Sequence, residues 1–488
     1  MLKKALLYSF AIFLVFSWGY FPAYPTDNDP ICPFDSTNTN HSRKKKKSKK
    51  QQLHEYAIRL DATEGNKKPI KENERKYPFS NYVKDVYNQL DTSKYSWADS
   101  VFNSLTPDER LAQLFMIPAY SNKGKEHKEQ IASLVYDYKV GGIIFFQGGP
   151  VRQAALTNYY QSLSKVPLMI SIDAEWGLSM RLDSTFKFPR QMMMGAIRND
   201  SLVYRMGAEI ARHCKRIGTH INFAPDIDIN NNPANPVISN RSFGEDKNSV
   251  TQKGIMYMKG MQDEKVLTTG KHFPGHGDTD SDSHLTLPII KHSRERIDSL
   301  ELYPFRHLFR QGLLGAMVAH LYIPNLDSTP NLASTLSPKI VNDLLKEELN
   351  YKGLIFTDAL NMKGVAKFYE PGIVDLKAVL AGNDVLLNAE DVPKAMEQIQ
   401  EAIYQGILSW DQINSRCLKI LRFKEWLGLN NYKPVDLKNI YEDINTPESE
   451  LVNRLIVEEA ITVLSNKNDR LNSCQKSTSS NGIFFQLF

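Results

Sequence analysis

A chain of 488 residues, 42% of them hydrophobic, is long enough for one large barrel with appendages, since α/β barrels commonly take about 250 residues or more. Its formal net charge of +5 is local, because the tract RKKKKSKK at 43–50 contains seven basic residues and leaves the rest of the chain slightly acidic. This distribution excludes a nucleic-acid-binding body. Four scattered cysteines (Cys32, Cys214, Cys417 and Cys474) exclude a disulfide framework.

The first residues have the composition of an export signal. Lys3 and Lys4 precede an apolar run from Ala5 to about Phe16, which is how the charged and apolar regions of such a signal are arranged. Apolar character continues through Phe21, so we expect residues 1–24 to be a signal peptide or a membrane anchor formed by residues 5–24. Both alternatives predict an exported protein that is periplasmic or associated with the cell envelope.

Residues 25–92 are polar, rich in lysine and poor in apolar periodicity, which is typical of a disordered basic linker. Order is expected over residues 93–430. Within them the segment LTPDERLAQLFM predicts a helix from residue 107, because Thr106 and Glu109 form a capping box around Pro107.

Eight short apolar runs follow, each ending in polar or glycine-rich residues. They are FMIPAY (115–120), GGIIFFQGG (141–149), PLMISIDAE (167–175), HINFAPDIDI (220–229), VLTTGKHFPGHG (266–277), GAMVAH (315–320), LIFTDAL (354–360) and NDVLLN (383–388). Near-continuous apolar character predicts parallel strands that are buried on both faces.

The stretches between these runs have helical periodicity, as in DSLVYRMGAEIARHCKRIG and SPKIVNDLLKEELN. Eight strands that alternate with helices predict an α/β fold of the (β/α)8 TIM-barrel type. The alternative, a doubly wound open sheet, requires a glycine fingerprint after the first strand, and FMIPAYSNKGKE has none.

Charged and polar residues lie at or just past the carboxyl ends of the predicted strands. They are Asp173, Glu175, Asp226, Asp228, Lys271, His272, His320 and Asp358. In a barrel these ends form the active-site face, so we expect the side chains to converge on one mouth.

The segment KHFPGHGDTDSDSH at 271–284 is dense in histidine and aspartate, which suits either a metal site or proton chemistry. A calcium loop would need glycine and glutamate where Ser283 and Ile289 stand. Neither an H-x-x-x-H helix nor a cysteine pair supports zinc. We therefore expect neither a metal nor another cofactor.

Proton chemistry requires a group that both donates and accepts protons near neutral pH, and histidine is the side chain suited to this. His284 follows Asp282 by two residues, and a carboxylate in that position can orient the imidazole. Asp358, at the end of an apolar strand, is a carboxylate that could attack an anomeric carbon. A nucleophilic carboxylate with an acid/base group, typically about 5 Å apart, carries out retaining glycoside hydrolysis.

Four segments resemble glycoside hydrolase family 3, specifically its bacterial β-N-acetylglucosaminidase branch. They are KHFPGHGDTDSDSHLTLP, INFAPDIDINNNPANPVISNRSFGED, MVAHLYIPNLD and LIFTDALNM. The resemblance covers roughly residues 97–429 in the expected order. It implies a retaining exo-β-N-acetylglucosaminidase that acts on carbohydrate, namely peptidoglycan-derived fragments.

The resemblance also implies roles for individual residues. Asp358 matches the nucleophile, and Asp282 with His284 matches the acid/base dyad of the branch. The positions that bind the sugar beside the nucleophile are matched by Asp173, Arg181, Arg241, Lys271 and His272. Trp176 stands where a glycine is common in the family, and it suits either sugar stacking or packing at the barrel rim. His276 is interpreted as part of the loop structure, and His320 as either a positioning or a core residue.

Residues 431–488 are expected to hold a connector and the truncated start of a second domain, because EEAITVLSNKNDRL resembles the opening of the α/β sandwich that often follows this barrel. Two functional alternatives stay open. One is a phosphorylase on the same site, since a neutral histidine does not repel phosphate. The other is a non-catalytic, envelope-anchored sugar-binding module. The sequence does not predict an oligomeric state.

Overall fold

The computed structural model describes residues 97–283 and 286–462. The predicted export signal, the basic linker, His284 and the chain beyond Thr462 lie outside the described residues. Within the described part of the chain, no helix combines the length and the apolar character that a membrane span requires.

Eight parallel strands form the sheet, in the order β7-β6-β5-β4-β3-β2-β1-β8. The strands are β1 (Phe115–Ala119), β2 (Gly142–Phe145), β3 (Met169–Ile172), β4 (Ile221–Asn222), β5 (Leu267–Phe273), β6 (Gly315–Val318), β7 (Leu354–Thr357) and β8 (Leu386–Leu387). A parallel bridge between Phe356 and Val385 joins β7 to the start of β8 and closes the ring. The predicted (β/α)8 barrel is therefore confirmed, and each of the eight apolar runs contains one strand.

The fourth strand is much shorter than the apolar run that predicts it. The run covers residues 220–229, whereas β4 ends at Asn222. Pro225 has no backbone N–H to donate, so the ladder cannot continue unbroken through this position. After this interruption the chain pairs with β5 again at one position, the parallel bridge between Asp226 and Lys271. This interruption places Asp226 and Asp228 beside β5.

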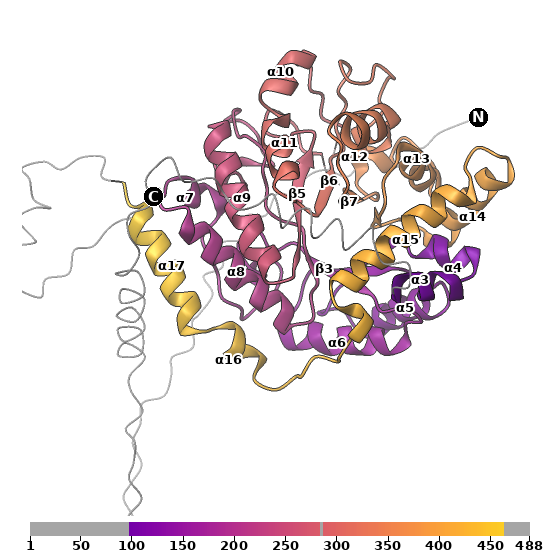
Figure 1. Cartoon of the computed structure of the whole chain (residues 1–488), viewed down its shortest axis with the longest axis horizontal. Helices are drawn as coiled ribbons and strands as arrows, with labels where there is room; N and C mark the ends of the chain where they lie inside the picture. The colour runs from indigo at the N-terminus through magenta and orange to yellow at the C-terminus, as the bar shows by residue number, and fades with distance from the viewer. Residues whose placement is uncertain (1–96, 284–285, 463–488) are drawn as a thin grey trace, which may run out of the picture. The chain divides into compact units, whose positions relative to one another are not determined.

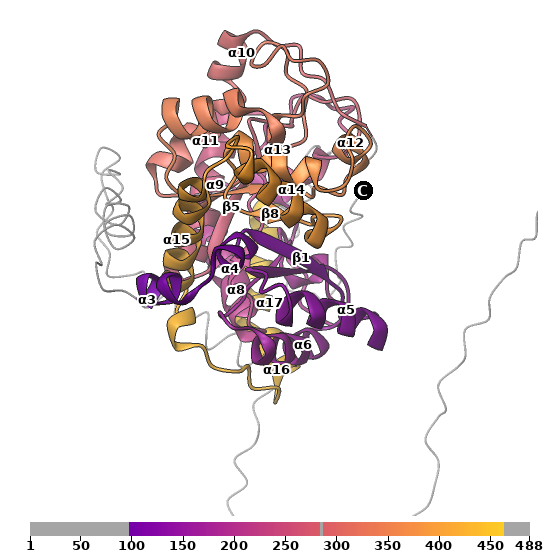
Figure 2. The same cartoon turned by 90° about the vertical axis from the view of Figure 1, so that its right-hand side faces the viewer.

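Helices surround the strands (Figure 1, Figure 2). They are α3 (Trp97–Ser104), α4 (Pro107–Ala112), α5 (Lys125–Tyr136), α6 (Pro150–Leu163), α7 (Gln191–Gly195), α8 (Ser201–Arg216), α9 (Lys247–Asp263), α10 (Arg294–Ser299), α11 (Leu302–Arg310), α12 (Lys363–Ala366), α13 (Ile373–Ala381), α14 (Val392–Tyr404), α15 (Trp410–Trp426), α16 (Ile440–Ile444) and α17 (Pro447–Ala460). The 3-10 segments are η2 (Leu178–Met180), η3 (Ser239–Arg241), η4 (Ser334–Leu336) and η6 (Leu429–Asn431), and η5 (Lys339–Glu348) is a π-helix.

The capping box predicted at the start of α4 is present. The Glu109 backbone N–H donates to Thr106 Oγ1 at 3.2 Å, and the Thr106 N–H donates to Glu109 Oε2 at 2.9 Å. Pro107 occupies the first turn, where a missing N–H has no cost. This helix leads directly into β1, so the local cap fixes where the first strand of the barrel begins.

The last described helices, α16 and α17, pack against α8 outside the barrel, and α17 lies alongside α8 in Figure 1. Ile440, Val452 and Ile456 are fully or almost fully buried and belong to the same apolar cluster as the inward face of α8. Arg205 of α8 also forms a 3.0 Å ion pair with Glu448. Residues 440–460 are therefore part of the packed body that surrounds the barrel.

Candidate active site

A cavity of about 420 Å³ lies at the carboxyl ends of the strands. The residues that line it come from loops after most of the strands: Tyr120, Ile144, Phe146, Asp173, Met180, Arg181, Val237, Arg241, Lys271, His272, His276, Ser283, Met317, Asp358, Ala359, Asn361, Met362, Leu387 and Asn388. The predicted convergence of strand-end side chains on one mouth is thus present for Asp173, Lys271, His272 and Asp358.

Asp358 directly follows β7 and is half-buried at the cavity wall. Its backbone N–H donates to the carbonyl of Val318 at 3.0 Å, which ties it to the end of β6. Its Oδ1 accepts from the N–H of Ala359 at 2.8 Å. Next to it, His320 Nε2 donates to the carbonyl of Ala359 at 3.0 Å, so the buried His320 holds the segment after Asp358. The structure thus favours the positioning interpretation of His320.

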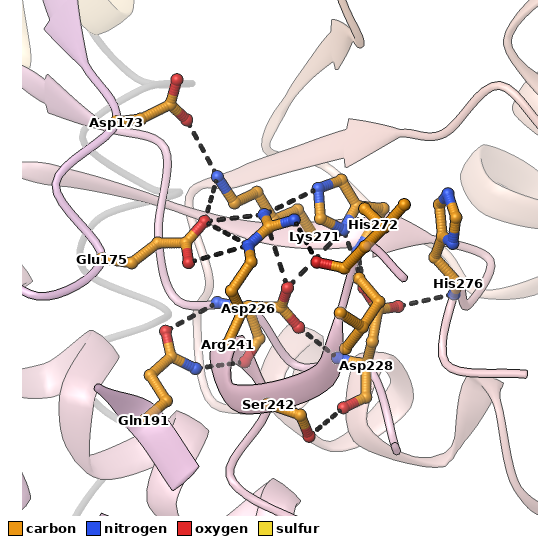
Figure 3. A network of polar contacts seen from close by, with 12 residues as sticks. Asp173, Glu175, Gln191, Asp226, Asp228, Arg241, Ser242, Lys271, His272 and His276 are labelled. Carbon is orange, nitrogen blue, oxygen red and sulfur yellow. Dashed lines mark hydrogen bonds and ion pairs between the residues drawn. The ribbon is translucent and has the colours of Figure 1, made fainter. Parts of the chain in front are cut away.

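Five charged side chains form a continuous network at the cavity, and four of them, Asp173, Glu175, Arg241 and Lys271, are labelled in Figure 3. Lys271 Nζ lies 2.9 Å from Asp173 Oδ1 and 2.9 Å from Glu175 Oε1. Arg181 Nη2 binds the other oxygen of Asp173 at 2.6 Å. Arg241 grips Glu175 through Nη2 at 2.7 Å and through Nε at 3.1 Å. Every carboxylate is held by two cations, so the network has its orientation before any ligand arrives.

Burial and charge act in opposite directions on these carboxyl groups. Burial raises the pKa of Asp173, but the charges of Lys271 and Arg181 outweigh it and hold that pKa well below its usual range. Burial likewise raises the pKa of Glu175, while Arg241 and Lys271 together lower it to about 2. Both groups are ionised at neutral pH, so Asp173 at the cavity wall accepts hydrogen bonds and donates none.

A second buried layer, formed by Asp226 and Asp228, supports His272 and His276 (Figure 3). Asp228 Oδ2 accepts from His272 Nδ1 at 2.7 Å and from the His272 backbone N–H at 3.1 Å. Its Oδ1 accepts from the backbone N–H of His276 at 2.7 Å. Asp226 Oδ1 accepts from the Asp228 N–H at 3.0 Å. Asp228 therefore fixes both histidines that face the cavity from this side.

Asp226, Asp228 and His272 are the one group of described residues whose potential metal-ligand atoms lie within 4.8 Å of one another. Their contacts do not suit a divalent cation. Arg241 Nη2 lies 3.6 Å from Asp226 Oδ2, where a cation would be repelled. His272 Nδ1 is already committed to Asp228. Burial and the charge of Asp228 raise the pKa of Asp226 well above its usual value, which leaves a poor ligand.

With this geometry in place, comparison with known proteins identifies the family. The family model for the glycosyl hydrolase family 3 N terminal domain matches residues 106–423, well over half of the chain. The chain belongs to glycoside hydrolase family 3. The resemblance stated from the sequence is confirmed. The match begins at the capping box of α4 and ends within α15, so it covers the whole barrel.

This family 3 chain is similar to proteins named as β-hexosaminidases and to a solved β-N-acetylglucosaminidase. It is 33% identical over 327 residues to "Beta-hexosaminidase A" of Pseudoalteromonas piscicida, which covers 60% of this chain and 55% of that protein. It is 29% identical over 335 residues to "Beta-hexosaminidase LpqI" of Mycobacterium tuberculosis, which covers 66% of this chain and 83% of the relative. A solved family 3 β-N-acetylglucosaminidase from Paenibacillus sp. str. FPU-7 is 35% identical with a TM-score of 0.69, covering 75% of this chain and 70% of that one.

The structure brings six of the eight predicted site residues of this family 3 chain to the cavity: Asp173, Arg181, Arg241, Lys271, His272 and Asp358. Asp282 is half-buried and is followed by Ser283, which lines the cavity. His284 lies outside the described residues, so its role stays a prediction. Trp176 stacks under the guanidinium of Arg190, whose central carbon is 4.5 Å from the ring centroid. This contact favours rim packing for Trp176.

Sequence reasoning missed Tyr120, Phe146 and Asn388 at the family 3 cavity. They directly follow β1, β2 and β8, respectively. Their position after a strand was therefore the only sequence feature that could have indicated a place at the cavity. Tyr120 and Phe146 stack with ring centroids 5.5 Å apart and form an aromatic wall. His276 was interpreted as a loop residue, yet its side chain also faces the cavity.

Proposed function

We propose that this chain is a retaining exo-β-N-acetylglucosaminidase that hydrolyses terminal β-linked N-acetylglucosamine from peptidoglycan-derived glycans. The observation that carries the proposal is the position of Asp358, half-buried at the wall of a cavity that the preorganised Asp173, Arg181 and Lys271 cluster also lines. The names of the relatives, two β-hexosaminidases and a β-N-acetylglucosaminidase, support the choice of sugar.

The polar groups around the cavity suit an uncharged sugar. The cations Arg181, Arg241 and Lys271 are all paired with Asp173 or Glu175, and these two carboxylates neutralise two of the three positive charges. Two buried polar atoms on cavity residues, Arg181 Nε and Asn388 Oδ1, have no hydrogen-bond partner within the described part of the chain. A sugar hydroxyl can accept a hydrogen bond from Arg181 Nε and can donate one to Asn388 Oδ1.

In the proposed reaction the Asp358 carboxylate attacks the anomeric carbon while His284, oriented by Asp282, donates a proton to the departing glycosidic oxygen. This step gives a covalent glycosyl-enzyme and releases the aglycone. His284 then takes a proton from water, which attacks the anomeric carbon and frees Asp358. Two displacements at the same carbon return the β configuration.

The test compares aryl β-N-acetylglucosaminide with aryl β-glucoside in phosphate-free buffer. The wild-type chain should prefer the N-acetyl substrate, and Asp358→Asn should lower kcat/KM by about 10³-fold or more, since an amide is a poor nucleophile. Asp411→Asn on the exposed face of α15 is the matched control and should retain full activity.

Three results would contradict the proposal. Full turnover by Asp358→Asn would remove the nucleophile. A sugar 1-phosphate that forms only when phosphate is added would indicate a phosphorylase. Saturable sugar binding without turnover would indicate a binding module.

We also propose that the chain acts outside the cytoplasm, in the periplasm or at the envelope. The support is the sequence pattern of residues 1–24, with Lys3 and Lys4 before an apolar run. Fractionation of cells that express the full chain tests this, and recovery of the protein from the cytoplasm alone would contradict it.

A further inference from the structure

Ser283, the middle residue of the Asp282–Ser283–His284 motif, is buried and held through its side chain. Its Oγ lies 3.1 Å from Nε2 of His276, which is also buried. His276 Nδ1 is 2.9 Å from Thr279 Oγ1, and the His276 backbone N–H donates to Asp228 Oδ1 at 2.7 Å. A continuous chain of contacts therefore runs from the buried Asp228 through the His276 ring to the loop that carries the acid/base pair.

The ring of His276 suits this linking role. Burial lowers its pKa to about 4, and the neighbouring His272 acts in the same direction. His276 is therefore a neutral imidazole near neutral pH. It carries one donor and one acceptor, which match the hydroxyls of Thr279 and Ser283. A group that stays neutral holds its neighbours without exchanging protons with the acid/base pair.

Helix α12 packs closely against the main chain of the same loop. A Cβ added to Gly364 would lie 2.5 Å from the Ser283 carbonyl oxygen and 2.6 Å from that of Thr286. Gly364 does not have a positive φ, so glycine is required by this close approach and not by the backbone conformation. Because α12 follows Asp358 by only a few residues, the contact joins the nucleophile segment to the acid/base loop.

The loop also closes on itself between these two contacts. The Thr286 N–H donates to the Asp282 carbonyl at 3.0 Å. Residues on both sides of His284 are thus fixed: Ser283 through its side chain and carbonyl, and Thr286 through its N–H and carbonyl.

We propose that His276 and Gly364 are positioning residues: His276 holds the Ser283 side chain and Gly364 lets α12 pack against the Ser283 carbonyl, so that together they fix the residue between the two members of the predicted acid/base pair. The proposal rests on the proposed function, because it assumes that this pair protonates the leaving group. Proton transfer in a displacement depends steeply on placement, and a shift of about 1 Å can cost about 100-fold in rate. Removing the His276 contact, or displacing the loop with a larger residue at position 364, therefore weakens acid catalysis, while the Asp358 N–H and Oδ1 keep their contacts with Val318 and Ala359.

The test measures kcat/KM for two aryl β-N-acetylglucosaminides, one with a 2,4-dinitrophenyl and one with a phenyl leaving group. The activated leaving group departs without protonation, whereas phenol requires the acid. Ser283→Ala, His276→Ala and Gly364→Ala should each lower kcat/KM for the phenyl substrate by about 10-fold or more. The same variants should stay within about 3-fold of wild type on the dinitrophenyl substrate. Ser281→Ala in the same loop should match wild type on both.

Equal losses on both substrates, or no loss on either, from variants that melt like wild type would overturn the inference. Ser283→Ala removes one oxygen only, so it carries the test if a larger change prevents folding. A wild-type chain that cleaves neither substrate overturns the proposed function itself, which separates the two failures.

Discussion

Asp226 and Asp228 are two residues apart, yet their surroundings move their pKa values in opposite directions. Burial and the charge of Asp228 raise the pKa of Asp226. For Asp228, burial also raises the pKa, but the hydrogen bond from His272 and its charge outweigh burial and lower it. As pH falls, Asp226 therefore takes up a proton before Asp228 does. Two carboxyl groups can share one buried layer because their surroundings separate the two titrations.

This difference predicts unequal effects of the same substitution. Asp226→Asn replaces a carboxyl group whose charged form is disfavoured by burial and by Asp228, so the free energy of unfolding should change by less than about 1 kcal/mol. Asp228→Asn loses charge-assisted bonds to His272 and His276 and should cost about 2–3 kcal/mol. Urea denaturation of both variants at pH 7 measures this. A larger loss for Asp226→Asn than for Asp228→Asn would contradict the assignment.

The lowered pKa of Glu175 predicts that the free energy of unfolding decreases at acid pH. Its pKa falls from 4.5 to about 2 on folding, so its stabilising contribution is fully present above pH 4.5 and is lost as pH falls toward 2. The loss is on the order of 3 kcal/mol. Urea unfolding of wild type and Glu175→Gln at pH 6, 4 and 3 tests this, because the variant should lose less stability across the range. An equal decline in both proteins would assign the acid sensitivity to other carboxyl groups.

At the scale of elements, α8 and α9 approach each other at backbone distance. A Cβ on Gly260 of α9 would lie 2.0 Å from the Tyr204 carbonyl oxygen of α8, and one on Gly207 would lie 2.5 Å from that of Tyr257. These helices flank β4 and lead into β5, which carries Lys271 and His272. Gly207 and Gly260 therefore allow α9 to pack closely against α8, and this packing also sets the position of β5, which follows α9.

Gly260→Ala should destabilise the protein by about 1–3 kcal/mol, because the added methyl group meets backbone atoms that cannot rotate away. Gly254→Ala in the same helix is the matched control. There the nearest atom is the Cγ2 methyl group of Ile227 at 2.9 Å, a side-chain atom, and the gain in helix propensity of about 1 kcal/mol offsets its displacement. Thermal melting compares the two, and equal melting temperatures would contradict the backbone contact.

Much of the barrel could be predicted from the sequence, because strands that are buried on both faces leave continuous apolar runs. Asp358 and Lys271 were predicted because charged residues at strand ends are conspicuous. Phe146 and Asn388 occupy equivalent positions, but an aromatic or amide residue there is not distinctive. The pairing of Arg241 with Glu175, 66 residues apart, and the contact of Gly364 with Ser283 depend on how loops meet in space. No local pattern encodes either one.

At the scale of the whole molecule, α17 extends the packed body beyond residue 423, where the family match ends. Oε1 of Glu459 in α17 accepts hydrogen bonds from the backbone N–H groups of Arg198 and Asn199. Ile456 of the same helix is fully buried against α8. These contacts place α17 in the same apolar cluster as the helices around β4 and β5. We therefore expect the barrel and α17 to unfold as one cooperative unit.

Ile456→Ala tests this cooperativity. It should lower the free energy of unfolding by about 2–4 kcal/mol through the cavity that it leaves. The loss should be the same by tryptophan fluorescence and by residual activity. Glu458→Ala, on the exposed side of the same helix, should change stability by less than about 0.5 kcal/mol. A loss confined to helix content, with activity retained at the wild-type midpoint, would show that α17 unfolds independently.

The central claim is that Asp358 attacks the anomeric carbon of a β-N-acetylglucosaminide. Its most direct test is to trap the glycosyl-enzyme with a 5-fluoro N-acetylglucosaminyl fluoride and to locate the added mass by peptide mass spectrometry. We expect one sugar per chain, bound to the peptide that contains Asp358, and no adduct in Asp358→Asn. A sugar attached to any other residue, or an adduct that persists in Asp358→Asn, would contradict it.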